Sequence, residues 1–191
     1  MRKPTLLGGA AAVLILLGVA GCGSGGGSGS AASSTVDPNG AEVSPPGDIP
    51  DNQAFVAYQP PGGGYSVKVP EGWARTKTDG AVVFTDKLNA IRMESGKRSS
   101  SLTIAAAQKT AGGLRGAKVS AVQRKAGTAI LTTYLRKAQP DPVTGKAGTD
   151  AVERYAFFRN GREVTLTLSG PKGADNVDPW RIVTDSLRFT R

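Results

Sequence analysis

One segment near the C-terminus constrains the fold more than any other: two strand-like runs, residues 152–159 and 163–169, joined by Asn160-Gly161. Asn-Gly accepts the two positive φ angles of a type I′ turn, so the segment predicts a tight antiparallel hairpin. The second run alternates apolar and polar side chains, which predicts one buried face and one face exposed to water. The expected core residues are Val164, Leu166 and Leu168, and the expected water-facing residues are Glu163, Thr165 and Thr167.

Other short runs with strand character precede this hairpin. They span residues 65–69, 81–85, 90–93, 101–107, 118–124 and 128–136. Pro70 lacks an N–H and ends the first of these strands. Within 101–107, the alternation of Leu102, Ile104 and Ala106 predicts a half-buried strand.

The last segment has helical character instead. Asp178 is expected to cap a helix in which Trp180, Val183 and Leu187 form one apolar stripe, and a short strand is expected at 188–190. These elements predict an α+β fold, with a single antiparallel sheet of about 6–8 strands and a C-terminal helix packed on one face.

The N-terminal region predicts secretion. Arg2 and Lys3 precede an apolar stretch that is too short for a membrane span of ~20 residues. It ends in Val19-Ala20-Gly21-Cys22, which resembles the lipobox of bacterial lipoproteins. That resemblance implies cleavage before Cys22, lipid on its thiol and a place on the extracytoplasmic face of the cell membrane. The alternative is an ordinary signal peptide followed by an unmodified cysteine.

This interpretation divides the chain into three parts. Residues 1–21 form the signal peptide. Residues 22–54 are rich in Gly, Ser, Ala, Pro and Asp and predict a lipid-bearing, disordered tether, because they cannot bury enough apolar surface to fold. Residues 55–191 are long enough for a single globular domain.

Three features of the globular part resemble a known family. The run from Tyr65 to Trp73, the antiparallel meander and the closing Ser186-Leu187-Arg188-Phe189 are similar to the PsbP-like α/β/α sandwich. The resemblance covers roughly residues 55–191 and implies a binding or assembly module rather than an enzyme. The link between Ala107 and Lys118 departs from the family pattern because it is short and rich in glycine. One covering helix is therefore expected to be reduced or missing.

The composition excludes most of the known catalytic arrangements. The chain has no histidine and one cysteine, so it lacks the usual general base, the Ser-His and Cys-His pairs and the commonest zinc ligand. Ser169-Gly170-Pro171-Lys172 matches Ser-x-x-Lys, but Gly-Pro after a strand disfavours the helical turn that this motif needs. Thr144-Gly145-Lys146 lacks the first glycine of a phosphate-binding loop. We expect no catalytic residue, no cofactor and no metal site.

Two groups of residues remain as candidates for binding a partner. Asp175, Asn176 and Asp178 offer the oxygen ligands that calcium takes, but they lack the EF-hand spacing, and helix capping explains them as well. Tyr65 and Trp73 are suited to an aromatic patch or to closing the end of the sheet. The partner-binding candidates are Tyr65, Trp73, Asp175, Asn176, Asp178 and Arg181.

The charge balance completes the functional prediction. The formal net charge is +9, which favours anionic partners or simply keeps the surface soluble. We expect a non-catalytic binding or assembly module, held at the membrane by lipid on Cys22. Its partner is another envelope protein or an anionic envelope polymer, and not nucleic acid, since no nucleic-acid-binding motif is present. Two alternatives stay open: an envelope-modifying hydrolase that uses carboxylates such as Asp175 and Asp178, and a small-ligand carrier with an apolar cavity.

Overall fold

The computed structural model describes residues 46–140 and 145–190. The predicted signal peptide, Cys22 and most of the predicted tether lie outside the described residues, as does Thr144 of the Thr-Gly-Lys run. The described elements, in chain order, are β1 (Phe55–Tyr58), β2 (Tyr65–Pro70), β3 (Ala74–Thr78), β4 (Ala81–Asp86), β5 (Asn89–Lys97), α1 (Ile104–Ala111), β6 (Arg115–Arg124), β7 (Gly127–Pro140), β8 (Ala147–Arg159), β9 (Arg162–Pro171), α2 (Val177–Ser186) and β10 (Arg188–Phe189).

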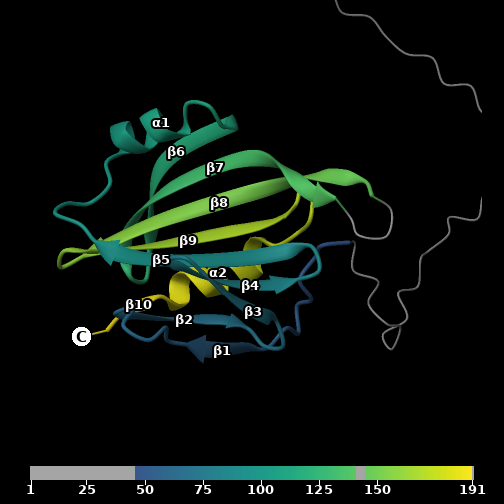
Figure 1. Cartoon of the computed structure of the whole chain (residues 1–191), viewed down its shortest axis with the longest axis horizontal. Coiled ribbons are helices and arrows are strands. Elements are labelled where there is room, and N and C mark those ends of the chain that lie inside the picture. The colour runs from purple at the N-terminus through teal and green to yellow at the C-terminus, as the bar shows by residue number, and fades with distance from the viewer. Residues whose placement is uncertain (1–45, 141–144, 191) are drawn as a thin grey trace, which may run out of the picture. The chain divides into compact units, whose positions relative to one another are not determined.

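The strands form two antiparallel sheets (Figure 1). The large sheet has seven strands in the order β3-β4-β5-β9-β8-β7-β6, and the small sheet has the order β1-β2-β10. The predicted α+β class is confirmed, with a seven-stranded antiparallel sheet and a C-terminal helix. The strands β2 and β10 match the segments expected at 65–69 and 188–190. The separate small sheet was not predicted, because β1 is too short to show a clear alternation and the pairing of distant strands leaves no local signal.

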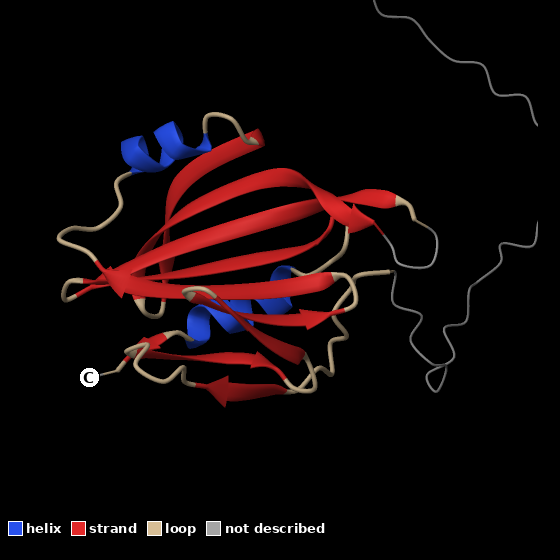
Figure 2. Cartoon of the chain, in the orientation of Figure 1, coloured by secondary structure: helices blue, strands red, loops and turns tan. Residues whose placement is uncertain are grey.

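One face of the large sheet packs against α2 and the small sheet. Figure 2 shows α2 between the two sheets. Its predicted apolar stripe is confirmed: Trp180, Val183 and Leu187 are all buried in the same core as Val67 of β2 and Leu166 of β9. The main hydrophobic cluster of the described residues forms where α2 lies between the two sheets, so most of the core is on this face.

The predicted β8–β9 hairpin is also confirmed. Asn160 has a φ of 49° and Gly161 a φ of 75°, the two positive angles that a type I′ turn requires. Arg159 pairs with Arg162 directly across the turn. The local turn chemistry therefore sets the register of the two central strands.

Residues 101–107 correct the sequence prediction. They do not form a strand, because α1 begins at Ile104. Thr103 is its N-cap, and the Thr103 hydroxyl accepts a hydrogen bond from the Ala106 N–H at 3.1 Å. The run of alanines after Ile104 favours a helix over a strand. α1 has 8 residues and ends at Ala111, before the glycines of the link to β6.

The second face of β9 gives a further correction. The side chains of Glu163, Thr165 and Thr167 were expected to face water. These three residues are instead buried, with exposed fractions of 9%, 4% and 8%. The Arg98 side chain lies against Glu163. Thr167 lies between Arg92 and Arg154 in the strand register. Long arginine side chains can cover apolar or small neighbours while their charged ends stay hydrated.

Within the described residues, neither helix is both long enough and apolar enough to cross a membrane.

Candidate functional site

A groove with a volume of about 700 Å³ lies beside α2 on the described surface. Its walls come from α2, from β1, β2 and β10 of the small sheet, and from the turn between β6 and β7. The residues that line it are Ala57, Ser66, Val67, Lys68, Lys125, Arg181, Ile182, Asp185, Ser186 and Arg188. We refer to it as the α2 groove.

The α2 groove is cationic. Lys68, Lys125, Arg181 and Arg188 contribute four positive side chains, against the single carboxylate of Asp185. In the described part of the chain, the ammonium groups of Lys68 and Lys125 have no hydrogen-bond or ion-pair partner, and both residues are exposed. Ile182 adds an exposed apolar side chain, 45% accessible. The groove thus combines available positive charge with an apolar contact.

Local structure places these side chains. Lys68 lies on the outward-facing side of β2, between the buried Val67 and Val69. The Lys68 N–H donates to the Ser186 hydroxyl at 2.7 Å, which joins β2 to the end of α2. Arg188 donates to the carbonyl oxygens of Asp185 and Leu187 at 2.9 and 2.6 Å. A cation in this position complements the free carbonyls and the dipole at a helix C-terminus.

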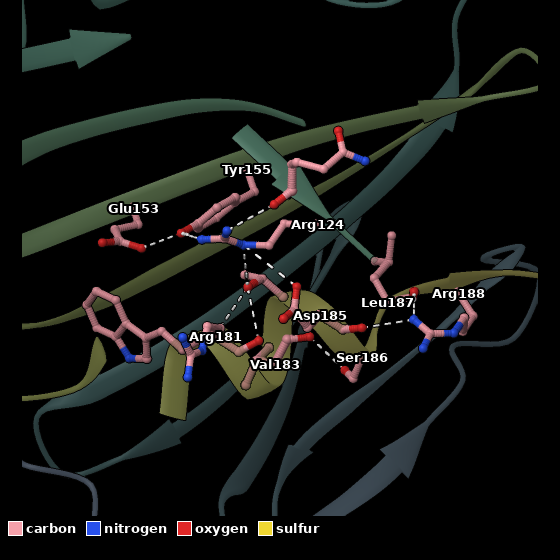
Figure 3. A network of polar contacts seen from close by, with 12 residues as sticks. Arg124, Glu153, Tyr155, Arg181, Val183, Asp185, Ser186, Leu187 and Arg188 are labelled. Atoms are coloured by element: carbon pink, nitrogen blue, oxygen red, sulfur yellow. Dashed lines mark hydrogen bonds and ion pairs between the residues drawn. The ribbon is translucent and has the colours of Figure 1, made fainter. Parts of the chain in front are cut away.

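Behind the groove, a polar network ties the β6 edge to α2 (Figure 3). Arg124 donates to the Thr184 hydroxyl at 3.2 Å and to the Tyr155 hydroxyl at 3.1 Å. Its guanidinium also lies 5.2 Å from the Tyr155 ring centroid. The Tyr155 hydroxyl in turn donates to Glu153 at 2.6 Å. This network holds the β6–β7 turn, and with it Lys125, against α2.

The same network changes the acidity of its tyrosine. The pKa of Tyr155 is raised to about 12, first by burial, then by the hydrogen bond to Glu153 and by that carboxylate's charge. Arg124 acts in the opposite direction. Because the phenol donates to Glu153, its neutral form is the one that the fold favours.

The two aromatic candidates lie apart from the α2 groove. Trp73 is buried in the core and contributes to packing. Tyr65 is 2% exposed and, with Tyr58, lines a separate hollow of about 270 Å³. Burial and the neighbouring Tyr58 raise the pKa of Tyr65 to about 12. The structure does not bring these two residues together with the acidic candidates.

The Asn176 side chain has a structural role, because it joins distant segments through hydrogen bonds. Its side-chain oxygen accepts from the Ile49 N–H at 2.8 Å, and its amide donates to the Gly47 carbonyl at 2.9 Å and to Asn89 at 3.1 Å. Ile49 is 5% exposed and packs in the core. The Asp175 N–H donates to Asp48 at 2.9 Å. Asn176 and Asp175 therefore fasten residues 47–49 to the start of α2.

The expected cap of α2 needs a correction. The helix begins at Val177, so Asn176 is the N-cap and Asp178 lies in the first turn. Asp178 pairs with Arg181 at 3.1 Å, with both side chains well exposed. An acid in the first turn still favours the helix through its dipole. Of the six partner-binding candidates, Arg181 alone lines the α2 groove.

The Ser-x-x-Lys match has no catalytic geometry. The Ser169 hydroxyl accepts from Arg136 at 2.8 Å, and Ser169 is 3% exposed. Lys172 is exposed beyond the end of β9. No hydrogen bond joins the two side chains in the described chain, and no group of three or more potential metal-ligating side chains occurs within it.

The sequence did not single out Lys68, Lys125 or Arg188. The available signal was the surplus of bases along the middle of the chain, which does not say which of them converge. Lys68 lies on β2 of the small sheet and Lys125 in the β6–β7 turn of the large sheet, and both line one groove because α2 packs between the two sheets.

No protein-family model matches the chain, and no curated protein matches its sequence. Among solved structures, a protein from Bacteroides thetaiotaomicron is similar with a TM-score of 0.53 and 17% identity. The match covers 71% of this chain and 48% of that one, so the chain spans about half the length of that protein. At this identity the similarity concerns the fold alone.

Two further solved structures are similar at lower TM-scores. Cyanobacterial PsbP (CyanoP) from Synechocystis has a TM-score of 0.45 and 15% identity, over 72% of this chain and 93% of that one. The Ran-binding protein Mog1p from Saccharomyces cerevisiae has a TM-score of 0.47 and 11% identity, over 72% and 96%. Neither similarity bears on function, and the fold class rests on the observed sheets and helix.

Proposed function

We propose that this protein is a lipid-anchored, extracytoplasmic binding or assembly module that holds an acidic segment of another envelope protein in the α2 groove. The single observation that supports this most is the charge of the groove: four cations line it against one acid, and Lys68 and Lys125 have no partner in the described chain. Available cations on a concave surface attract acidic partners and raise the rate of encounter.

The apolar contact favours a protein over a polymer. Ile182 is exposed within the groove, next to Arg181. Protein interfaces combine an apolar centre with a polar rim, whereas an anionic polysaccharide offers few apolar groups. Lipid on Cys22, as the lipobox resemblance implies, would keep the groove near such a partner at the membrane.

The test is site-specific photo-cross-linking in living cells. A photoreactive residue at Lys125, in the groove, is compared with one at Lys87, in the β4–β5 turn. We expect one acidic membrane or envelope protein to be captured from position 125 and not from position 87, and capture to fall when Cys22→Ala removes the lipid site. Loss of capture in Lys68→Glu/Arg181→Glu, with folding retained, would support the role of charge.

Two outcomes count against this proposal. Equal capture from positions 87 and 125 would mean that the groove has no special role. If no protein is captured but purified protein binds an anionic envelope polymer, the partner is the polymer instead. The geometry does not support the alternative of a hydrolase that uses carboxylates. Asp175 and Asp178 are both exposed, and Asp178 is ion-paired with Arg181.

A further inference from the structure

A second hollow lies on the opposite face of the large sheet, beneath α1. Figure 1 shows α1 over β6 and β7, away from α2. The hollow has a volume of about 130 Å³. Its apolar wall comes from α1 and the residues that flank it: Leu102, Ala107, Ala111 and Leu114. We refer to it as the α1 pocket.

A more open groove of about 240 Å³ continues from the α1 pocket. Arg98, Arg154, Glu163 and Thr165 line both hollows. The charged side chains therefore lie where the apolar pocket opens into the groove. A ligand that entered the pocket with an apolar group would leave its polar end beside these side chains.

Glu163 presents an unsatisfied acceptor at this boundary. The residue is 9% exposed, and its Oε1 pairs with the Arg98 Nε at 3.2 Å. The other oxygen, Oε2, is buried and has no hydrogen-bond partner in the described chain. An unpaired buried polar atom is destabilising, and more so if it is charged. A ligand that donates a hydrogen bond to Oε2 would remove this penalty.

Arg154 presents the opposite charge. Other arginines around this face have carboxylate partners: Arg92 pairs with Glu94, Arg98 with Glu163 and Arg136 with Asp150. The Arg154 guanidinium has neither a hydrogen-bond nor an ion-pair partner among the residues that the structure describes. A guanidinium is suited to bind a carboxylate through two parallel hydrogen bonds.

We propose that the α1 pocket binds a free α-amino acid with an apolar side chain. The apolar group enters the pocket, whose volume of about 130 Å³ is close to that of a cavity of ~150 Å³ that binds benzene. The α-carboxylate pairs with Arg154, and the α-ammonium donates to Oε2 of Glu163. A simple carboxylic acid would leave Oε2 without a donor, and a simple amine would leave Arg154 without an anion. This site is separate from the α2 groove and does not depend on the proposed function.

The test is calorimetric titration of the purified full chain with leucine and phenylalanine in both configurations. Three comparison compounds each lack one feature: leucinamide has no carboxylate, 4-methylpentanoate has no ammonium, and glycine has no apolar side chain. We expect at least one of the four amino acids to bind, and each comparison compound to bind at least about tenfold more weakly than leucine or phenylalanine, as loss of one charged hydrogen bond or of the apolar contact predicts.

Variants separate recognition from general charge. Arg154→Gln and Glu163→Gln should each weaken binding by about tenfold or more. Arg159→Gln removes the same charge from β8 but does not line the pocket, so it should bind as the parent does. Arg154 is exposed, so its variant is expected to fold even if Glu163→Gln does not.

Three results would overturn the proposal. The first is no binding by any of the four amino acids at millimolar concentration. The second is equal binding by leucine, leucinamide and 4-methylpentanoate, because the paired charges would then be irrelevant. The third is an equal loss of affinity in Arg154→Gln and Arg159→Gln, because the effect would then be one of net charge.

Discussion

Both faces of the seven-stranded sheet are covered, but by different kinds of side chain. On the α2 face, β9 places Val164, Leu166 and Leu168 in the core, each 0% exposed. On the α1 face, the same strand places the polar side chains of Glu163, Thr165 and Thr167, and all three residues are also buried. The first face is apolar and closed by a helix and a second sheet. The second is polar, only partly covered by α1, and retains a hollow. The comparison shows that a buried face need not be an apolar core face, and the hollow on the polar face is where we place the small ligand.

The largest expected effect is a difference in the free energy of unfolding between a variant on the α2 face and a variant on the α1 face. Leu166→Ala removes a fully buried side chain from the α2 face and should lower the free energy of unfolding by about 2–5 kcal/mol. Thr165→Ala, the adjacent residue on the α1 face, should cost about 1 kcal/mol or less, since little volume is lost. Denaturant titration of both variants gives the two values. Equal losses would mean that the two faces stabilise the domain alike.

The next largest loss of stability is expected where residues 47–49 contact the start of α2. Asn176→Ala removes three hydrogen bonds and leaves buried partners unsatisfied, so we expect a loss of about 2–3 kcal/mol. Asp175→Ala is a suitable control, because Asp175 is exposed and its contact to Asp48 uses the backbone N–H, which the variant keeps. A loss as large for Asp175→Ala would contradict the role given to Asn176.

The Arg124 network predicts a smaller, pH-dependent effect on the α2 face. The pKa of Tyr155 is raised to about 12 in the fold, against 10.0 for the free side chain. The unfolded chain therefore loses its proton first, so this contribution is complete below pH 10 and is lost as the pH rises towards 12. Tyr155→Phe should lower the free energy of unfolding by about 1–2 kcal/mol at pH 8.

Between pH 10 and 12 the same variant should lose stability less steeply than the parent, because it has no phenol to titrate at this position. Unfolding free energies measured at several pH values in this window give the two slopes. Parallel slopes for Tyr155→Phe and the parent would contradict the link between Tyr155 ionisation and stability.

The smallest expected effect is on the stability of α1, which covers part of the α1 face. Thr103→Ala removes the side-chain cap of α1 and should cost about 0.5–1 kcal/mol. The change should show as faster amide hydrogen exchange in α1, with β9 unchanged. Thr103→Ser keeps a hydroxyl and should restore protection. Faster exchange in β9 as well would mean that α1 and the sheet open together.

Local chemistry explains what the sequence predicted well. The β8–β9 hairpin follows from Asn160-Gly161 and the alternation after it, and the α2 stripe follows from Trp180, Val183 and Leu187. Both signals lie within a few neighbouring residues. The strand prediction for 101–107 was wrong because the alternation of Leu102, Ile104 and Ala106 is compatible with a strand, whereas the cap at Thr103 starts a helix. All five residues of β3 are exposed, so it has no apolar alternation to detect.

The candidate sites were harder to predict, because they depend on contacts between distant segments. Arg181 is a sequence candidate because it follows the acidic residues Asp175 and Asp178, and it does line the α2 groove. Lys68 and Lys125 join it from elements that only the folded chain brings together. The sequence gives no signal for Glu163 or Arg154 as binding residues, because a polar residue on an alternating strand predicts exposure to water. Period-two alternation distinguishes apolar from polar faces but does not report whether the polar face is covered.

Measuring both sites in the same variants tests the separation of the two faces most directly. Lys68→Glu/Lys125→Glu should abolish capture of an acidic partner, detected with a photoreactive residue at Ile182, and leave amino-acid affinity unchanged. Arg154→Gln should do the reverse. Lys77→Glu/Lys172→Glu, which changes the same charge away from the α2 groove, should leave both unchanged. If Arg154→Gln weakened partner capture as much as the groove variant does, the two faces would not carry separate binding sites.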